Sequence, residues 1–209
     1  MLNVKILKII ILGSWKVGKT SILNRYFDNT FQEDMMSTIG IDHRTRFFKF
    51  GGDKIRIDYI DTAGQEIYKS IAASYLKKAD GVILTFDISM RESFDLIKSW
   101  IEEIETNINV NNIGKILLGN KCDLEKQRKI SENEGESLAL NIKCKYMEVS
   151  AKTGKNITEA LEEIAKNTYE KFHSLRRYTS SFSLHEKVKK VKFKKKKDNS
   201  NLVKCCQDV

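Results

Sequence analysis

Residues 9–20 read Ile-Ile-Ile-Leu-Gly-Ser-Trp-Lys-Val-Gly-Lys-Thr, an apolar run followed by two glycines and a Lys-Thr pair. The run Ile6–Leu12 is too short to span a membrane and is typical of a parallel strand covered on both faces. Gly13–Thr20 match the spacing Gly-x-x-x-x-Gly-Lys-Ser/Thr, which predicts a phosphate-binding loop between a strand and a helix.

The residue types in this loop suit phosphate chemistry. Glycines let successive backbone N–H groups point at phosphate oxygens, and a helix starting near Lys19 adds the positive end of its dipole. Lys19 can bridge the β- and γ-phosphates of a nucleotide, and the Thr20 hydroxyl can ligate Mg²⁺. A glycine-rich turn with a chance lysine is the alternative, and the amphipathic stretch over residues 22–27 disfavours it.

Charge divides the chain into two parts. The 209 residues carry a net charge of +9, and residues 171–209 hold 12 Lys and Arg against 3 Asp and Glu. We therefore expect a folded domain over residues 1–173 and a flexible basic tail over residues 174–209. The four cysteines have no zinc-finger spacing and are too few for a disulfide scaffold, which favours a reducing compartment. Neither a signal peptide nor a membrane-spanning run is expected.

Strand and helix patterns alternate along the chain, which predicts an α/β protein. Gly51-Gly52 is a strong hairpin signal, and Ser131 with Glu134 predicts a capping box. The expected fold is that of a P-loop NTPase, with a mostly parallel six-stranded sheet, one antiparallel hairpin strand and helices on both faces. Beyond residues 6–12, strands are expected over 41–50, 54–60, 81–87, 115–120 and 145–149, helices over 67–79, 92–108, 131–140 and 156–172, and loops over 28–40 and 61–65.

A second polar motif, Asp61-Thr62-Ala63-Gly64-Gln65-Glu66, follows an apolar strand. A carboxylate at a strand end, Asp61, can hold a Mg²⁺ water. The N–H of Gly64 can approach a γ-phosphate because no Cβ stands in the way. Gln65 can orient an attacking water, since its amide offers both a donor and an acceptor.

Two further motifs predict recognition of guanine. In Asn120-Lys121-Cys122-Asp123 the carboxylate can accept two N–H bonds from guanine, which adenine cannot supply, and Lys121 can lie across the ring. Ser150-Ala151-Lys152 can read the 6-oxo oxygen through a backbone N–H, while the Lys152 stem packs on the base. An ATPase is therefore disfavoured.

The loop over residues 28–40 contains a candidate switch. The Thr38 hydroxyl can reach Mg²⁺ only if the loop closes over a γ-phosphate, so the loop would order with GTP and be released with GDP. Phe31 could stack edge-on against guanine. Taken alone, each of these residues has a simpler interpretation: Thr38 as a solvated threonine and Phe31 as an anchor of the loop.

These motifs, in this order, resemble the Ras superfamily of small GTPases over about residues 5–172, and the Rab family most closely. The segments 37–42, 68–71, 75–81 and 84–89 are similar to Rab signatures, and Cys205-Cys206 is similar to the Rab terminus that carries two geranylgeranyl groups. The resemblance implies a slow GTPase that regulates vesicle traffic on the cytoplasmic face of intracellular membranes and cycles through the cytosol. Implied partners are an exchange factor, a GTPase-activating protein, effectors, and an escort protein or GDP-dissociation inhibitor; a monomer is expected.

The resemblance also assigns the site, with Gln65 as the catalytic residue and Thr20, Thr38 and Asp61 around Mg²⁺. Contacts to GTP or GDP are implied for Gly13, Ser14, Trp15, Lys16, Val17, Gly18, Lys19, Thr20, Ser21, Phe31, Thr38, Asp61, Gly64, Asn120, Lys121, Asp123, Leu124, Ser150, Ala151 and Lys152.

The tail fits membrane anchoring. Two lipid chains, or one chain with a basic patch, hold a protein stably on a membrane, and the tail offers Cys205, Cys206 and the run Lys187–Lys197. Each lysine near an anionic leaflet contributes about 1 kcal/mol. A nuclear GTPase whose tail binds nucleic acid is the alternative, and the paired cysteines argue against it.

Several residues depart from the family pattern. Trp15 and Lys16 stand where relatives usually carry small residues, and a ring beside the γ-phosphate could displace water or an incoming arginine. We therefore expect intrinsic hydrolysis below about 10⁻⁴ s⁻¹, and a GTP-locked binding scaffold is the alternative function. Trp15 could also fold outward without effect. His43 and Ile60 replace aromatic residues expected on the effector surface, and Ile67 replaces a common arginine.

Overall fold

A six-stranded sheet forms the centre of the computed structural model, which describes residues 4–33, 41–62, 74–109 and 112–175. The chain divides into two units, Met1–Phe172 and His173–Val209, and the sheet belongs to the first. The strand order is β2-β3-β1-β4-β5-β6. The strands are β1 (Lys5–Leu12), β2 (Ile41–Phe50), β3 (Asp53–Thr62), β4 (Gly81–Asp87), β5 (Gly114–Asn120) and β6 (Lys145–Glu148).

The sheet is mixed in the way the sequence predicts. β1 pairs in parallel with β3 and β4, and β5 joins β4 and β6 in parallel. The antiparallel pair is β2 with β3. Gly51 and Gly52 connect these two strands with φ of 54° and 91°, the two positive values that a tight type I′ hairpin turn needs.

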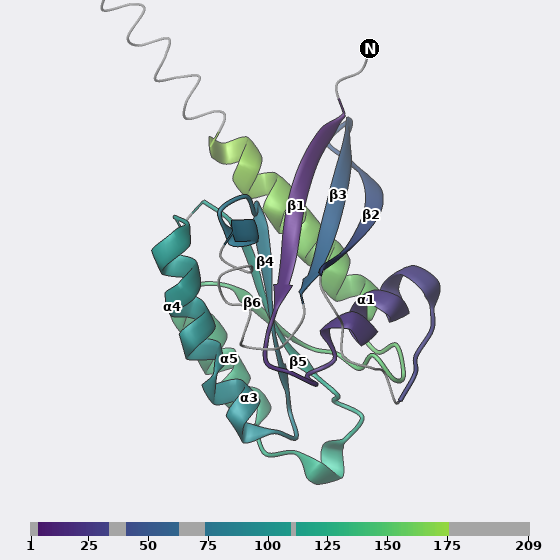
Figure 1. Cartoon of the computed structure of the whole chain (residues 1–209), viewed down its shortest axis with the longest axis vertical. Coiled ribbons are helices and arrows are strands. Elements are labelled where there is room, and N and C mark those ends of the chain that lie inside the picture. Colours follow the sequence, from purple (N-terminus) through teal and green to yellow (C-terminus); the bar gives the residue numbers. More distant parts are fainter. Residues whose placement is uncertain (1–3, 34–40, 63–73, 110–111, 176–209) are drawn as a thin grey trace, which may run out of the picture. The chain divides into compact units, whose positions relative to one another are not determined.

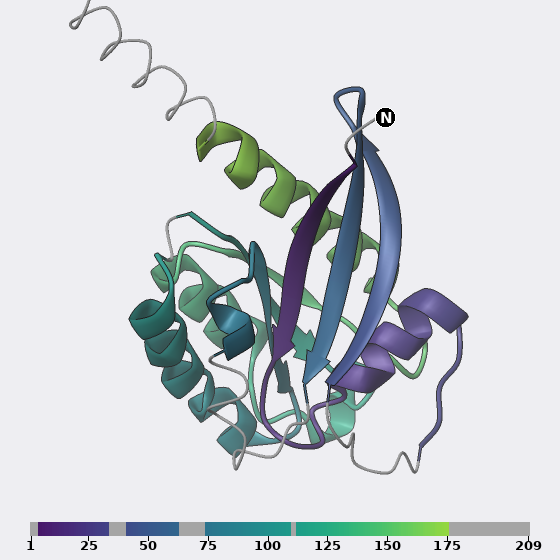
Figure 2. The same cartoon turned by 45° about the horizontal axis from the view of Figure 1, so that its top comes forward.

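Helices cover both faces of the sheet (Figures 1 and 2). One face packs against α1 and the helix of residues 157–175, drawn in light green, and the other packs against α3, α4 and α5. Because side chains alternate along a strand, Ile9 and Ile11 lie in the first core, and Ile10 and Leu12 lie in the second. The labelled helices are α1 (Lys19–Asp28), α3 (Arg91–Asp95), α4 (Ile97–Asn107) and α5 (Glu132–Asn141), with a 3₁₀ turn η2 at Glu125–Gln127.

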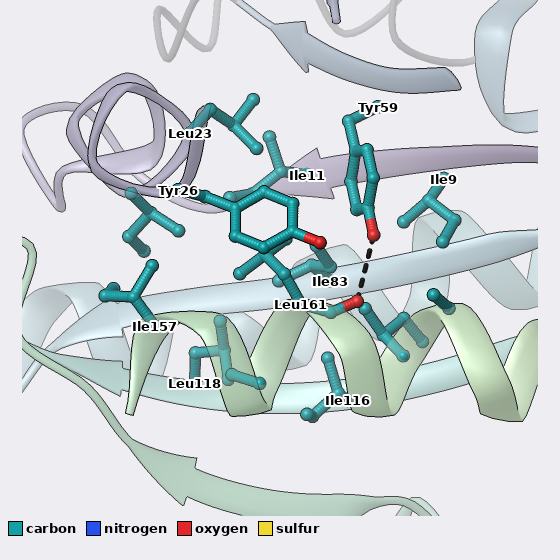
Figure 3. Close-up of a cluster of buried hydrophobic side chains, with 14 of the residues drawn as sticks. Ile9, Ile11, Leu23, Tyr26, Tyr59, Ile83, Ile116, Leu118, Ile157 and Leu161 are labelled. Atoms are coloured by element: carbon teal, nitrogen blue, oxygen red, sulfur yellow. Dashed lines mark hydrogen bonds between the residues drawn. The ribbon is translucent and has the colours of Figure 1, made fainter. Parts of the chain in front are cut away.

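Buried tyrosines join β3 to two helices in the first core (Figure 3). The hydroxyl of Tyr59 donates a hydrogen bond of 2.9 Å to the carbonyl of Leu161. The ring of Tyr26, from α1, meets the Tyr59 ring edge-on at 5.8 Å between centroids. The hydrogen bond gives the polar end of a fully buried side chain a partner, so the tyrosine is held without an orphaned hydroxyl.

Most predicted elements are confirmed, including the capping box of Ser131 and Glu134. Several predicted boundaries differ from the structure, and three of the differences concern the site and the helices. β3 continues through Thr62, so Asp61 lies in a strand and not in a loop. The predicted helix over 67–79 ends at Leu76 where it is described, and turns follow. The predicted helix over 92–108 is interrupted at Leu96, whose carbonyl also accepts the Ser99 hydroxyl at 2.8 Å; such side-chain bonds compete with the helix ladder.

In the parts of the chain that are described, no helix has the length and apolar character needed to cross a membrane. The proposed tail over residues 174–209 falls almost entirely outside the described residues, as do Cys205 and Cys206, so the domain boundary and the tail stay predictions.

Candidate nucleotide site

The loop between β1 and α1 is shaped by two glycines (Figure 1). A Cβ on Gly13 would lie 2.1 Å from the carbonyl oxygen of Thr85 in β4, and one on Gly18 would lie 2.4 Å from the Asn120 amide nitrogen. Gly18 also has a φ of 92°, which side-chain-bearing residues rarely adopt. The loop therefore lies tightly against the backbone of β4 and the side chain of Asn120, and its close fit requires glycine at both positions.

Lys19 lies across this loop. Its side chain is buried, and its ammonium donates to the carbonyl oxygens of Gly13 at 2.8 Å and Ser14 at 2.9 Å. A buried ammonium costs free energy unless it is well paired, so these bonds hold the charge inside the loop. The arrangement places one fixed positive charge at the start of a helix, where the dipole also favours an anion.

Thr20, in the first turn of α1, lies beside Asp61, near the C-terminal end of β3. The Thr20 hydroxyl donates to Asp61 Oδ2 at 2.6 Å. Asp61 is 1% exposed, and its Oδ1 has no hydrogen-bond partner among the described residues. Burial raises the pKa of Asp61, and the Thr20 hydroxyl and the Lys19 ammonium oppose that rise. An orphaned carboxylate oxygen beside a hydroxyl is a donor set that fits Mg²⁺.

Asn120 joins the phosphate loop to the loop after β6. Its Nδ2 donates to the Val17 carbonyl at 2.8 Å, and its Oδ1 accepts from the Ala151 N–H at 3.2 Å. The side chain is 1% exposed. Two loops that are far apart in the sequence are therefore fixed to each other through one buried amide.

The residues predicted to read a base surround this junction. The Ser150 hydroxyl donates to Asp123 Oδ1 at 2.5 Å, which orients an exposed carboxylate. Lys121 has a φ of 63°, and its ammonium pairs with Asp87 at 2.7 Å. Leu124 is half-buried in the same loop.

The remaining predicted contacts differ in exposure. Trp15 is 45% exposed, and the Lys16 ammonium lies 4.1 Å from the centre of its ring. Val17 is fully buried, and Ser21 is half-buried in α1. Phe31 packs against the first core. The Lys152 ammonium pairs with Glu33 at 2.9 Å, and that contact brings the loop after α1 to the loop after β6.

Some predicted residues cannot be placed, and two participants were missed. Thr38, Gly64, Gln65 and Ile67 lie outside the described residues. Sequence reasoning missed Arg25, which donates to the Ala151 carbonyl at 2.9 Å and to the Lys152 carbonyl at 2.8 Å. It also missed Asp87, the partner of Lys121. No local motif signals either contact, because the partners are far apart in the sequence.

The two residues that stand in place of effector-surface aromatics differ in exposure. Ile60 is 1% exposed and packs in the second core, so its side chain does not form surface. His43 is exposed, and its ring lies 5.9 Å from that of Tyr75.

A mostly parallel sheet with a glycine-rich loop, a buried lysine and a helix start after its first strand defines a P-loop nucleotide-binding domain. The chain matches the model of the Ras family over residues 8–170. It is 37% identical over 190 residues to the Ras-related protein Rab-8 of Diplobatis ommata, which covers 91% of this chain and 89% of the relative.

Two mammalian relatives give similar values. The identity is 38% over 166 residues to Rab-8B of Homo sapiens, covering 79% of this chain and 80% of the relative. It is 39% over 160 residues to Rab-8A of Mus musculus, covering 77% of each chain. The chain therefore belongs to the Rab small GTPases of the Ras family. Proteins of this family bind GTP and GDP and hydrolyse GTP to GDP.

Proposed function

We propose that this chain is a GTP/GDP switch in vesicle traffic that acts at the cytoplasmic face of intracellular membranes. The observation that carries the proposal is the Asn120 amide, which bonds to both the phosphate loop and the loop after β6. A site built this way couples the two ends of a nucleotide. Binding of the guanine base and binding of the phosphates would therefore strengthen each other. Rab kinship supports the cellular role.

The described residues support some of the proposed contacts, and the resemblance to the family supplies the others. Lys19 neutralises phosphate oxygens from within the loop, and Asp123, oriented by Ser150, accepts the N–H groups of guanine. Thr20, Asp61 and Thr38 would hold Mg²⁺, which would neutralise phosphate charge when bound. Gln65 would orient the attacking water. We propose nucleotide contacts also for the other residues that the resemblance implies, which run from Gly13 to Lys152.

Exchange factor, GTPase-activating protein and effectors are the partners that Rab kinship supports. We further propose lipidation of Cys205 and Cys206, shielding of the lipids by an escort protein or GDP-dissociation inhibitor, and contact of Lys187–Lys197 with anionic lipid. We also propose that the protein is a monomer and that it does not bind nucleic acid.

A second candidate rests on Trp15. Its ring stands at the rim of the phosphate loop beside Lys16, so it could crowd the γ-phosphate and suppress hydrolysis. The protein would then serve as a GTP-locked scaffold.

Single-turnover hydrolysis of preloaded GTP with Mg²⁺ distinguishes the two, measured for the wild type beside Trp15→Gly. A switch with its ring directed outward hydrolyses GTP at a similar slow rate in both proteins. An acceleration of about tenfold or more in Trp15→Gly, about 1.4 kcal/mol of barrier, would support the scaffold. Nucleotide retained after purification gives an independent reading, because persistent GTP supports the scaffold and GDP supports the switch.

A further inference from the structure

Arg128 joins the loop after β5 to the last residue of β6. It lies just after η2, and its guanidinium donates to Glu148 Oε1 at 2.6 Å and to Glu148 Oε2 at 2.8 Å. On its other side Glu125 accepts at 2.7–3.0 Å, and the Ile130 carbonyl accepts at 3.0 Å. Every N–H group that a guanidinium offers therefore has an acceptor, which fixes the plane of the side chain.

The pair with Glu148 is the more buried of the two ion pairs. The side chains of Arg128 and Glu148 are 19% and 11% exposed, whereas that of Glu125 is 69% exposed. The Tyr146 hydroxyl donates a further bond of 3.0 Å to Glu148 Oε1. Hydrogen bonds to Glu148 and Glu125 raise the pKa of Arg128. A buried, two-pronged pair has a defined geometry and is screened little by salt, so it can hold two segments at a fixed distance.

The pair acts where the sheet ends. β5 and β6 lie side by side in parallel (Figure 1), and their pairing ends at Gly119 and Glu148. The motifs proposed to read the base follow both strands. Asp123 precedes Arg128 in the loop after β5, and Ser150 follows Glu148 after β6. The bond of 2.5 Å from the Ser150 hydroxyl to Asp123 therefore joins the same two segments as the ion pair.

Other bonds hold this loop in the domain when the ion pair is removed. The N–H groups of Lys129 and Ile130 donate to the Ile88 carbonyl at 2.9 Å and 3.1 Å, which ties the far end of the loop to the segment after β4. A variant without the Arg128 guanidinium is therefore expected to fold, and its effect should be confined to the spacing of the loops after β5 and β6.

We propose that Arg128 is a positioning residue for guanine recognition. Through Glu148 it sets the distance between the two loops at which Ser150 orients the Asp123 carboxylate, and a binding group needs such support to keep its geometry. The proposal rests on the proposed function, in which Asp123 accepts the N–H groups of guanine. Because Arg128 acts through this contact, its loss should weaken recognition of the base and leave the contacts to the phosphates in place.

The test uses the full chain with Mg²⁺ and compares the release of GDP with that of inosine diphosphate, both carrying a fluorescent label on the ribose. Inosine lacks the 2-amino group of guanine, so Asp123 can accept one N–H bond from it instead of two. The variants are Arg128→Met, which removes the guanidinium, and Arg128→Lys, which keeps the charge and loses the fork. The control is Arg91→Met, because Arg91 of α3 also pairs with two carboxylates, those of Asp95 and Glu134.

Arg128→Met should release GDP at least about tenfold faster than the wild type, the lower end of what loss of an orienting partner costs at metal sites. Release of inosine diphosphate should accelerate much less, because the carboxylate makes one bond fewer to that base. Arg128→Lys should fall between the two, and it provides the same comparison should Arg128→Met not fold. Arg91→Met should match the wild type. Equal acceleration for both nucleotides, or for neither, would overturn the positioning role and leave the proposed function standing.

Asp123→Ala separates the positioning role from the function on which it rests. In this background the two nucleotides should leave at similar rates, and adding Arg128→Met should change neither rate, because residues that act through one contact are not additive. A further acceleration in the double variant would overturn the positioning role alone. Equal release of both nucleotides from the wild type would contradict the contact between Asp123 and guanine, and the proposed base recognition and the positioning role would fail together.

Discussion

Asn120→Ala is the substitution that reports most directly on how the nucleotide site is held together. It removes the bond of 2.8 Å from Asn120 to the Val17 carbonyl and the bond of 3.2 Å from the Ala151 N–H. Each bond contributes about 1 kcal/mol net, and each buried group left without a partner costs about 1–3 kcal/mol. Because the two loops relax in part, we expect a loss of about 2–4 kcal/mol in the free energy of unfolding.

Urea denaturation with excess GDP measures this loss, and release of a fluorescent GDP analogue measures the coupling of the two loops. GDP should dissociate at least about tenfold faster from Asn120→Ala, equivalent to about 1.4 kcal/mol. Asn133→Ala, an exposed position in α5, is the control and should stay within about 0.5 kcal/mol of the wild type. If Asn120→Ala lost no more stability than this control, the amide would not join the loops.

Other substitutions test the fold, and the titration of a half-buried thiol is tested as well. Ser131→Ala removes the capping box and should cost about 1 kcal/mol in urea melts; no change would mean that the cap is not formed in solution. Tyr59→Phe removes the bond to the Leu161 carbonyl and should cost about 1 kcal/mol, whereas a neutral result would refute that contact. Burial raises the pKa of Cys144 from 9.0 to about 11, so its contribution to stability is complete below pH 9 and is lost as pH rises through 11. Alkylation of Cys144 at pH 9 should therefore be much slower in the folded chain than in urea, and equal rates would contradict the burial.

The sequence predicted the elements whose signals are local. The apolar run into Gly13–Thr20 predicted β1, its loop and α1, and Gly51-Gly52 predicted the hairpin, because spacing and backbone freedom act over a few residues. Interruption of the helix at Leu96 was missed, because neither glycine nor proline marks it in the sequence. The burial of Trp100 in α4 was also not predicted from the sequence.

In the candidate site too, features with local signals were predicted and features that depend on distant residues were not. The sequence predicted which loops would meet, because the ends of parallel strands lie at one edge of a sheet. It did not predict the pairs that hold them, such as Arg25 with the Ala151 carbonyl or Lys121 with Asp87. Those contacts depend on tertiary packing. Roles for Thr38, Gly64 and Gln65 stay predictions, as they lie outside the described residues.

Competition for the nucleotide site tests the central claim most directly. The purified full chain would be loaded with a fluorescent GDP analogue in Mg²⁺ and challenged with GTP, GDP or ATP. We expect GTP and GDP to displace the analogue, and ATP to fail even in large excess, because adenine lacks the N–H groups that Asp123 accepts. Displacement by ATP at concentrations similar to those of GTP would contradict the proposal that this chain is a guanine-nucleotide switch.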